Sequence, residues 1–129
     1  MAIEALTPII FVAEIEPCLS FWTDLGFVNL GEVEHEGKLG FVMLQRDNAP
    51  VMYQSFASIE ADIPGMIDPA KGSVTTIYLR LTGLDEIKAQ LLAGDVVQEE
   101  RLTFYGAREI FVRAPCGTTV GFSEMPGNR

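Results

Sequence analysis

The sequence has few of the residues that build metal sites, disulfide frameworks and membrane segments. Of its 129 residues one is histidine, His35, and two are cysteines, Cys18 and Cys116. The cysteines form no Cys-x-x-Cys pair and are too few for a disulfide framework, so we expect two free thiols in a reducing cytoplasm. No apolar run approaches the roughly 20 residues of a membrane helix, and no basic segment precedes an apolar one at the N-terminus. We therefore expect a cytoplasmic protein with no membrane partner.

Basic residues are also scarce. Nine Lys and Arg stand against 18 Asp and Glu, which gives a formal net charge of −9 and a pI near 4.4. Such a charge repels phosphate backbones, so we expect no nucleic-acid partner. It favours a cationic small molecule as ligand; alternatively, it only keeps the protein in solution.

The rest of the composition is that of a globular domain, with 48% hydrophobic and 21% charged residues. A chain of this length buries enough surface to form a core without disulfides or metal. We therefore predict a single domain over residues 1–129.

The pattern of apolar and turn residues predicts the same succession of elements twice. Each half has a strand, a helix (17–25, with Glu16 as its N-cap, and 84–93) that ends at a glycine, and three further strands. Phe41-Val42 and Val51 in the first half recur as Phe111-Val112 and Val120 in the second (111 − 41 = 70; 120 − 51 = 69). We therefore predict an internal repeat, 5–57 and 73–125, joined by a loop at 58–72. The expected strands are 6–13, 27–35, 39–45 and 51–56, then 74–81, 96–102, 108–114 and 119–124.

Two motifs carry a resemblance to a known family. The first contains a strand, an acidic turn and an aromatic helix with a Leu-Gly-Phe stop; the second surrounds a Gly-x-Arg-Glu step. Their residues are Ile9-Ile10-Phe11-Val12-Ala13-Glu14-Ile15, Leu19-Ser20-Phe21-Trp22 and Leu25-Gly26-Phe27, then Thr103 to Arg113, Pro115, Gly117 and Phe122-Ser123-Glu124. In both motifs the sequence resembles the vicinal oxygen chelate superfamily of glyoxalases, bleomycin-resistance proteins and extradiol dioxygenases. It is most similar to the bleomycin-resistance branch.

The resemblance implies an α+β fold in which two βαβββ modules form a curled, cup-like mixed sheet, and it implies a homodimer. In the enzymes of the superfamily, metal ligands come from the first and last strands of each module. Those positions match Thr7, Met52 (or Tyr53, if the turn contains a gap), Thr76 and Gly121 of this sequence. None is a good ligand for a divalent ion. We therefore expect no metal, no cofactor and no catalytic residues, and we take His35 for a solvated hairpin residue.

Strand alternation predicts what lines the cup. If Thr7 faces the cup, the lining includes Phe11, Met52, Gln54, Tyr78 and Arg80, which suit a flat organic ligand with a few polar groups. Alternatively, these side chains simply fill the cup. The opposite and more apolar set packs under the helices: Ile10, Val12, Val51, Tyr53, Ile77, Leu79, Val120 and Phe122.

Two loop features remain. In the bleomycin-resistance branch an aromatic loop contributes to a groove between subunits, which makes Phe104 and Tyr105 ligand candidates; alternatively they anchor the loop by burial. Arg108 and Glu109 either contact a ligand or partner chain or form a stabilising ion pair.

These observations favour a metal-independent protein that sequesters a cationic or aromatic small molecule in an acidic groove of a homodimer. The alternative is a metal-dependent lyase or isomerase of the glyoxalase type with a non-standard metal site. A third hypothesis is an interaction module whose cup is filled by its own side chains.

Overall fold

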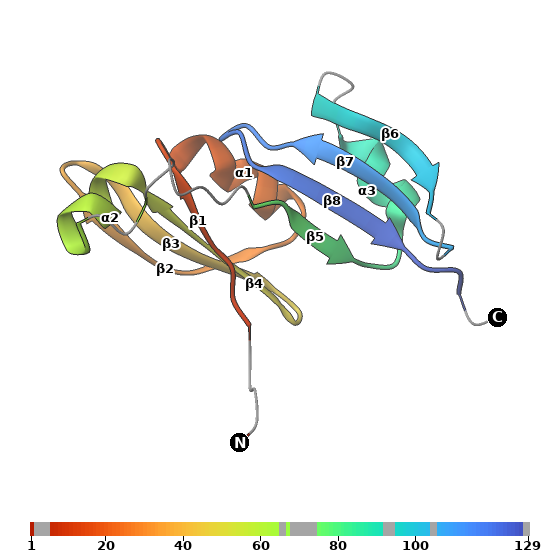
Figure 1. Ribbon diagram of the computed structural model, residues 1–129, viewed down its shortest axis with the longest axis horizontal. Helices are drawn as coiled ribbons and strands as arrows, with labels where there is room; N and C mark the ends of the chain where they lie inside the picture. The colour runs from red at the N-terminus through yellow and green to blue at the C-terminus, as the bar shows by residue number, and fades with distance from the viewer. Residues whose placement is uncertain (2–5, 65–66, 68–74, 92–94, 104–105, 128–129) are drawn as a thin grey trace. The chain divides into compact units, whose positions relative to one another are not determined.

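The computed structural model describes residues 1, 6–64, 67, 75–91, 95–103 and 106–127. The chain divides into two compact units, which we call unit 1 (Met1–Val74) and unit 2 (Thr75–Arg129). Each unit contains one four-stranded sheet and nearly all of one predicted repeat (Figure 1). Within the described ranges, no helix is long and apolar enough to cross a membrane.

The two sheets have the same strand order. Unit 1 has the order β1-β4-β3-β2 and unit 2 the order β5-β8-β7-β6; β1 with β4 and β5 with β8 are parallel pairs, and the other pairs are antiparallel. This confirms the predicted α+β fold with two βαβββ modules. The elements of unit 1 are β1 (Ile9–Val12), α1 (Glu16–Asp24), β2 (Val28–His35), β3 (Lys38–Arg46), β4 (Ala49–Ser55) and α2 (Phe56–Asp62). Those of unit 2 are β5 (Ile77–Arg80), α3 (Leu84–Gln90), β6 (Val96–Leu102), β7 (Arg108–Arg113) and β8 (Thr119–Glu124).

The strand register repeats as well as the strand order. Ile9 lies opposite Met52 in unit 1, and Tyr78 lies opposite Gly121 in unit 2 (78 − 9 = 69; 121 − 52 = 69). On the third strand the sequence comparison was wrong by two residues. Phe111 faces Gly121 as Met43 faces Met52, so Phe111 corresponds to Met43 (111 − 43 = 68). The shared Phe-Val pair had suggested Phe41 instead.

Helix α2 lies partly in the segment that was expected to be a loop. Its N-cap is Ser55, whose Oγ accepts a hydrogen bond from the backbone N–H of Ser58 at 3.1 Å. Ile59 is its buried residue. The Asp, Pro and Gly residues that follow gave this stretch a loop-like composition and hid a helix of under two turns.

In unit 1 the core lies between sheet and α1. The inward-facing strand residues are apolar and buried: Ile10, Val12, Val42, Leu44, Val51 and Tyr53. Trp22 of α1 is fully buried against them, and its indole Nε1–H donates to the Tyr53 hydroxyl at 3.0 Å. This bond supplies the partner that a buried tyrosine hydroxyl needs.

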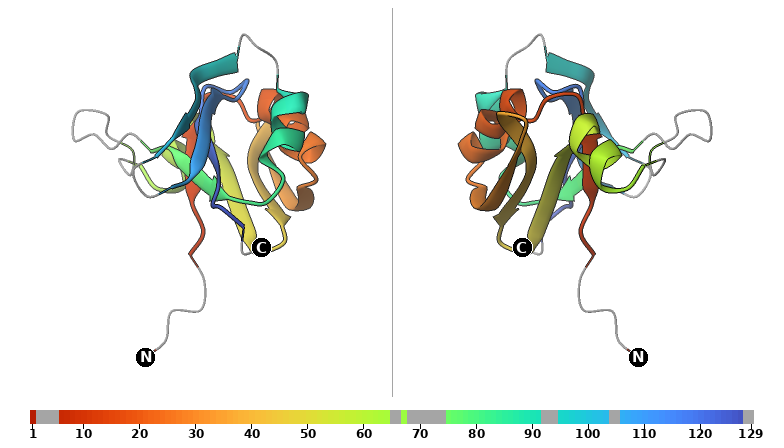
Figure 2. Two further views of the ribbon diagram at one scale, coloured as in Figure 1. Left: turned by 90° about the vertical axis from the view of Figure 1, so that its right-hand side faces the viewer. Right: turned by 90° about the vertical axis from the view of Figure 1, so that its left-hand side faces the viewer.

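In unit 2, α3 covers one face of the sheet (Figure 2). Leu84 of α3 is buried, as are the strand residues on that face, Ile77, Ile110, Val112, Val120 and Phe122; Leu79 is half-buried. The predicted division of the strands into a buried and a less buried face is therefore confirmed in both units.

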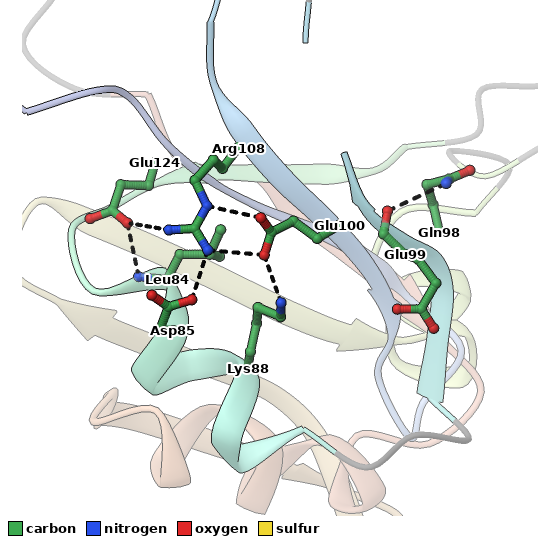
Figure 3. Close-up of polar contacts among 8 residues, drawn as sticks. All are labelled: Leu84, Asp85, Lys88, Gln98, Glu99, Glu100, Arg108 and Glu124. Atoms are coloured by element: carbon green, nitrogen blue, oxygen red, sulfur yellow. Dashed lines mark hydrogen bonds and ion pairs between the residues drawn. The ribbon is translucent and has the colours of Figure 1, made fainter. Parts of the chain in front are cut away.

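A network of ion pairs ties α3 to its sheet (Figure 3). Arg108 of β7 bonds Glu100 of β6 through Nε at 2.9 Å, and it bonds Asp85 of α3 at 2.7 Å. Lys88 of α3 reaches Glu100 at 2.6 Å. Glu124 of β8 accepts the backbone N–H of Gly83 at 2.8 Å, at the start of the helix. These groups are therefore committed to holding the helix.

The cysteine prediction was wrong. Neither Cys18 nor Cys116 is a free thiol, and both are disulfide-bonded. Because the sequence has no Cys-x-x-Cys pair, cysteine spacing gave no sign of this state.

We predict that Tyr53→Phe destabilises the protein, because it leaves the buried Trp22 N–H without this acceptor. The expected loss in unfolding free energy is about 1–2 kcal/mol. Urea unfolding of Tyr53→Phe, Trp22→Phe and the double variant gives the coupling energy of the pair. If the two single effects simply add, the hydrogen bond makes no contribution.

We also predict an acid-sensitive contribution from Glu100. Hydrogen bonds from Arg108 and Lys88 lower the pKa of Glu100 from 4.5 to about 2. A depressed carboxyl pKa stabilises the fold above the unfolded-state value, and that contribution is lost as the pH falls from about 5 toward 2. Glu100→Gln should therefore cost about 1–2 kcal/mol at neutral pH, and the difference from the parent should shrink over this pH window.

Urea unfolding at a series of pH values measures this. The matched control is Glu99→Gln, which removes the same charge from the neighbouring residue, whose carboxylate makes no contact in the cluster of Figure 3. An equal loss in both variants would mean that net charge, and not the network, sets the effect.

Candidate functional site

The predicted ligand residues of unit 1 share the sheet face opposite the core. Phe11, Gln54 and Phe41 lie in one row across β1, β4 and β3. Ile9, Met52 and Met43 form the next row. All of these side chains are partly or fully exposed, whereas their strand neighbours on the other face are buried. The structure thus brings Phe11, Met52 and Gln54 together, as predicted from strand alternation.

An open hollow of about 490 Å³ lies at one end of this face. It is bounded by β2, β3, β4 and α2, which lies beside the sheet in Figure 1. Its wall combines carboxylates, one imidazole, one amide and apolar groups. The lining residues are Val33, Glu34, His35, Phe41, Gln54, Ser58, Ala61 and Asp62. Of the residues predicted to bind ligand, Gln54 lines this hollow.

Local contacts explain why these side chains meet. Ser58 on the first turn of α2 accepts a hydrogen bond from Gln54 Nε2 at 3.1 Å, which fixes the amide of Gln54. Gly40 of β3 lies beneath His35 and Ser58. A Cβ at position 40 would come within 2.7 Å of His35 Cβ and 3.1 Å of Ser58 Cβ. Glycine is therefore required for the hairpin and α2 to approach each other this closely.

The hollow is acidic. Glu34 and Asp62 are exposed carboxylates on its wall, and both are formally negative at pH 7. The His35 side chain is 27% exposed, with Nε2 4.0 Å from Glu36 Oε1. It is therefore more buried than the solvated hairpin residue that the sequence suggested. Two carboxylates beside the ring of Phe41 can attract a cation that carries a flat apolar group.

In unit 2, Tyr78 and Arg80 of β5 lie on the sheet face opposite α3. Tyr78 is 43% exposed, and its hydroxyl donates to Glu109 Oε1 at 2.6 Å. Arg101 Nε donates to the other oxygen of Glu109 at 2.7 Å. Glu109 itself is 3% exposed. The Phe111 ring lies 5.9 Å from the Tyr78 ring, centroid to centroid.

Arg108 and Glu109 have different roles although they are adjacent. Arg108 lies opposite Glu124 on the α3 side of the sheet, and Glu109 lies opposite Ser123 on the other side. Strand alternation therefore sends one to the helix network and the other to the exposed face. For Arg108 the ion-pair alternative is confirmed.

The superfamily's metal positions are occupied by residues that coordinate poorly. Thr7 lies two residues before β1, Thr76 immediately precedes β5, and Met52 is half-buried. At Gly121 there is no room for a ligand side chain, because a Cβ would meet Phe111 at 2.6 Å and Tyr78 at 2.8 Å. Among the described residues, no three His, Cys, Asp or Glu side chains gather as a metal site.

Phe104 and Tyr105 lie outside the described residues, and their role stays a prediction.

Sequence reasoning missed the carboxylates of the hollow. Glu34 and Asp62 were missed because α2 was expected to be loop, so nothing placed it beside the β2–β3 hairpin. Glu109 was named together with Arg108, without the face of the sheet on which each side chain lies. The strand register makes Glu109 the counterpart of Phe41, on the face opposite the helix.

No protein-family model and no curated protein matches the sequence. Solved structures do match. A glyoxalase/bleomycin resistance protein/dioxygenase family enzyme from Burkholderia phytofirmans has a TM-score of 0.74 at 12% identity, covering 93% of this chain and 97% of that one. Lactoylglutathione lyase from Agrobacterium tumefaciens gives 0.67 at 16% identity, covering 96% of each chain. A bleomycin-binding protein in complex with bleomycin gives 0.64 at 20% identity, covering 96% of this chain and all of that one.

At these identities the likeness establishes the fold and not the activity. The chain therefore has the fold of the glyoxalase, bleomycin-resistance and dioxygenase proteins, as its resemblance to the vicinal oxygen chelate superfamily predicted.

Proposed function

We propose that the protein is a metal-independent binding protein that sequesters a cationic or aromatic small molecule without breaking a bond. The observation that carries this proposal is the hollow of unit 1. There, the carboxylates of Glu34 and Asp62 stand beside the aromatic ring of Phe41 and the fixed amide of Gln54.

The charge of unit 1 supports a cationic ligand. Residues 1–74 contain eleven Asp and Glu and three Lys and Arg, a net charge of −8, which is most of the chain's −9. An acidic surface raises the local concentration of cations and lowers that of anions. An amine or guanidine group on the ligand would meet Glu34 and Asp62 at the hollow.

The apolar part of the same face supports an aromatic ligand. Phe11 and Met52 continue the surface from Gln54 across β4 and β1. A thioether and aromatic rings adapt to a flat ligand through dispersion contacts. The amide of Gln54 would set its orientation by a hydrogen bond. Phe104 and Tyr105 belong to this proposal as further aromatic contacts.

The proposal includes a homodimer. Strand β2 is the edge of its sheet and exposes Val28 (59%), Leu30 (56%) and Val33 (61%). An exposed apolar edge strand favours association with another chain. Val33 also lines the hollow, so a dimer formed through β2 would deepen the ligand groove.

The structural neighbours support binding as the activity. One of them is a bleomycin-binding protein whose structure contains bleomycin. The alternative, a glyoxalase-type lyase or isomerase, has lactoylglutathione lyase among the same neighbours. The residues at Thr7, Met52, Thr76 and Gly121 count against that alternative, because they offer a metal no strong ligand.

In this proposal the protein acts in the cytoplasm. The disulfide-bonded state of both cysteines is the observation against that location, since disulfides persist mainly in oxidising compartments.

We predict that the pure protein binds the planar cation proflavine, and metal-free bleomycin, saturably at low salt. Asp62→Asn and Glu34→Gln should each weaken proflavine binding about three- to tenfold, because each removes one carboxylate from the wall of the hollow. Fluorescence titration measures this. The matched control is Glu32→Gln, which removes the same charge from an exposed residue of β2 outside the hollow.

Absence of saturable binding of both probes would overturn the proposal. An equal effect of Glu32→Gln and Asp62→Asn would show that net charge draws the cation and that the hollow does not bind it.

A further inference from the structure

Unit 2 differs from unit 1 in charge. Residues 75–129 contain seven Asp and Glu and six Lys and Arg, so the net charge of unit 2 is −1. The acidic character of the chain as a whole therefore says little about which ligand unit 2 attracts.

The charges of unit 2 are also sorted between the two faces of its sheet. On the α3 side, Glu100, Asp85 and Glu124 surround Arg108 and Lys88. The opposite face carries three arginines, Arg80, Arg101 and Arg113, which the strand register places opposite Ser123, Glu109 and Thr119. Two carboxylates accompany them: Glu109, and Glu99, which strand alternation places on the side of Arg101. The face is therefore locally positive within an acidic protein.

Glu109 does not offer its charge to a ligand. It is 3% exposed, and its two oxygens accept from the Tyr78 hydroxyl and from Arg101 Nε. Arg101 donates to Glu109 through Nε, and its side chain is 57% exposed. Arg80 is exposed and has no ion-pair partner within the described ranges. These arginines repel a cation, whereas the exposed guanidinium group of Arg80 can donate hydrogen bonds to an anion.

Two aromatic rings lie beside the row of Arg80, Glu109 and Arg101. The next row across the sheet is Tyr78, Gly121 and Phe111. Because Gly121 has no side chain, the two rings lean over it at a 37° interplanar angle. The Arg101 guanidinium lies 6.0 Å from the centre of the Phe111 ring. Tyr78 and Phe111 are each partly exposed, so a flat ring can stack on them.

We propose that this face of unit 2, which we call the arginine–aromatic face, binds a planar aromatic carboxylate. The ligand's ring stacks on Tyr78 and Phe111, and its carboxylate accepts charge-assisted hydrogen bonds from Arg80, with Arg101 contributing positive charge from the far side of the row. The face is distinct from the hollow of unit 1 in its residues and in the sign of its ligand.

The test uses the full chain and 2-naphthoate as the probe, with the neutral 2-naphthamide and the cationic 2-naphthylmethylammonium for comparison. We expect saturable ¹H–¹⁵N NMR shifts from naphthoate in the amides of β5, β7 and β8. Binding should be weaker for the amide and weakest for the cation. Arg80→Gln should weaken naphthoate binding about tenfold, and Arg80→Lys should restore part of it.

The matched control is Lys38→Gln, which removes the same charge from an exposed residue of unit 1. Proflavine binding to the parent protein is measured on the same samples, so failure of this proposal and failure of the proposed function are separate results. Equal naphthoate affinity in Arg80→Gln and the parent would overturn the proposal. NMR shifts confined to amides of unit 1 would also overturn it. Naphthoate binding that begins only when the protein is diluted would overturn it too, because a second copy of the chain would then cover this face.

Discussion

In each unit a helix packs on one face of the sheet and buries it. The side chains on the opposite face are therefore the ones that can contact a ligand. In unit 1 the seal is Trp22 of α1, buried against the sheet and hydrogen-bonded to Tyr53. In unit 2 it is Leu84 of α3, held by the ion pairs around Arg108. Strand alternation then leaves every second side chain on the opposite face, where apolar burial no longer dictates its chemistry. Rings, amides and charged groups can be placed there at little cost to the core.

The two open faces carry opposite charges, although the chain is strongly acidic. Glu34 and Asp62 make the hollow of unit 1 negative, while Arg80 and Arg101 make the face of unit 2 positive. Of the carboxylates of unit 2, Glu109 pairs with Arg101, whereas Glu100 and Glu124 lie on the other side of the sheet with Arg108. Arg80 therefore has no ion-pair partner among the described residues. Under both proposals, net charge indicates the sign of the ligand for unit 1 and not for unit 2.

Much of this arrangement could be predicted from the sequence, because strands are recognised by alternating apolar residues and by the turn residues between them. The succession of apolar stretches and turns gave the βαβββ repeat. Strand alternation gave the apolar residues that pack under the helices, and it placed Phe11, Met52 and Gln54 on one face. The residues that line the hollow were not predicted, because several of them belong to α2. This helix is short, and its N-cap Ser55 is a residue type that is also common in turns. The face on which Glu109 lies was not predicted, because Arg108 and Glu109 were treated as one charged step. The state of the cysteines depends on distance in space, which spacing in the sequence does not report.

In the proposed function, ligand binding needs no metal. The most direct measurement is metal content: incubate the protein with Mn, Fe(II), Co, Ni and Zn in turn, desalt it, and count the metal ions per chain by elemental analysis. With Thr7, Met52, Thr76 and Gly121 at the superfamily's ligand positions, the account predicts no retained metal and unchanged proflavine binding. About one tightly held ion per chain, released by a chelator together with an activity, would contradict it and favour the glyoxalase-type enzyme.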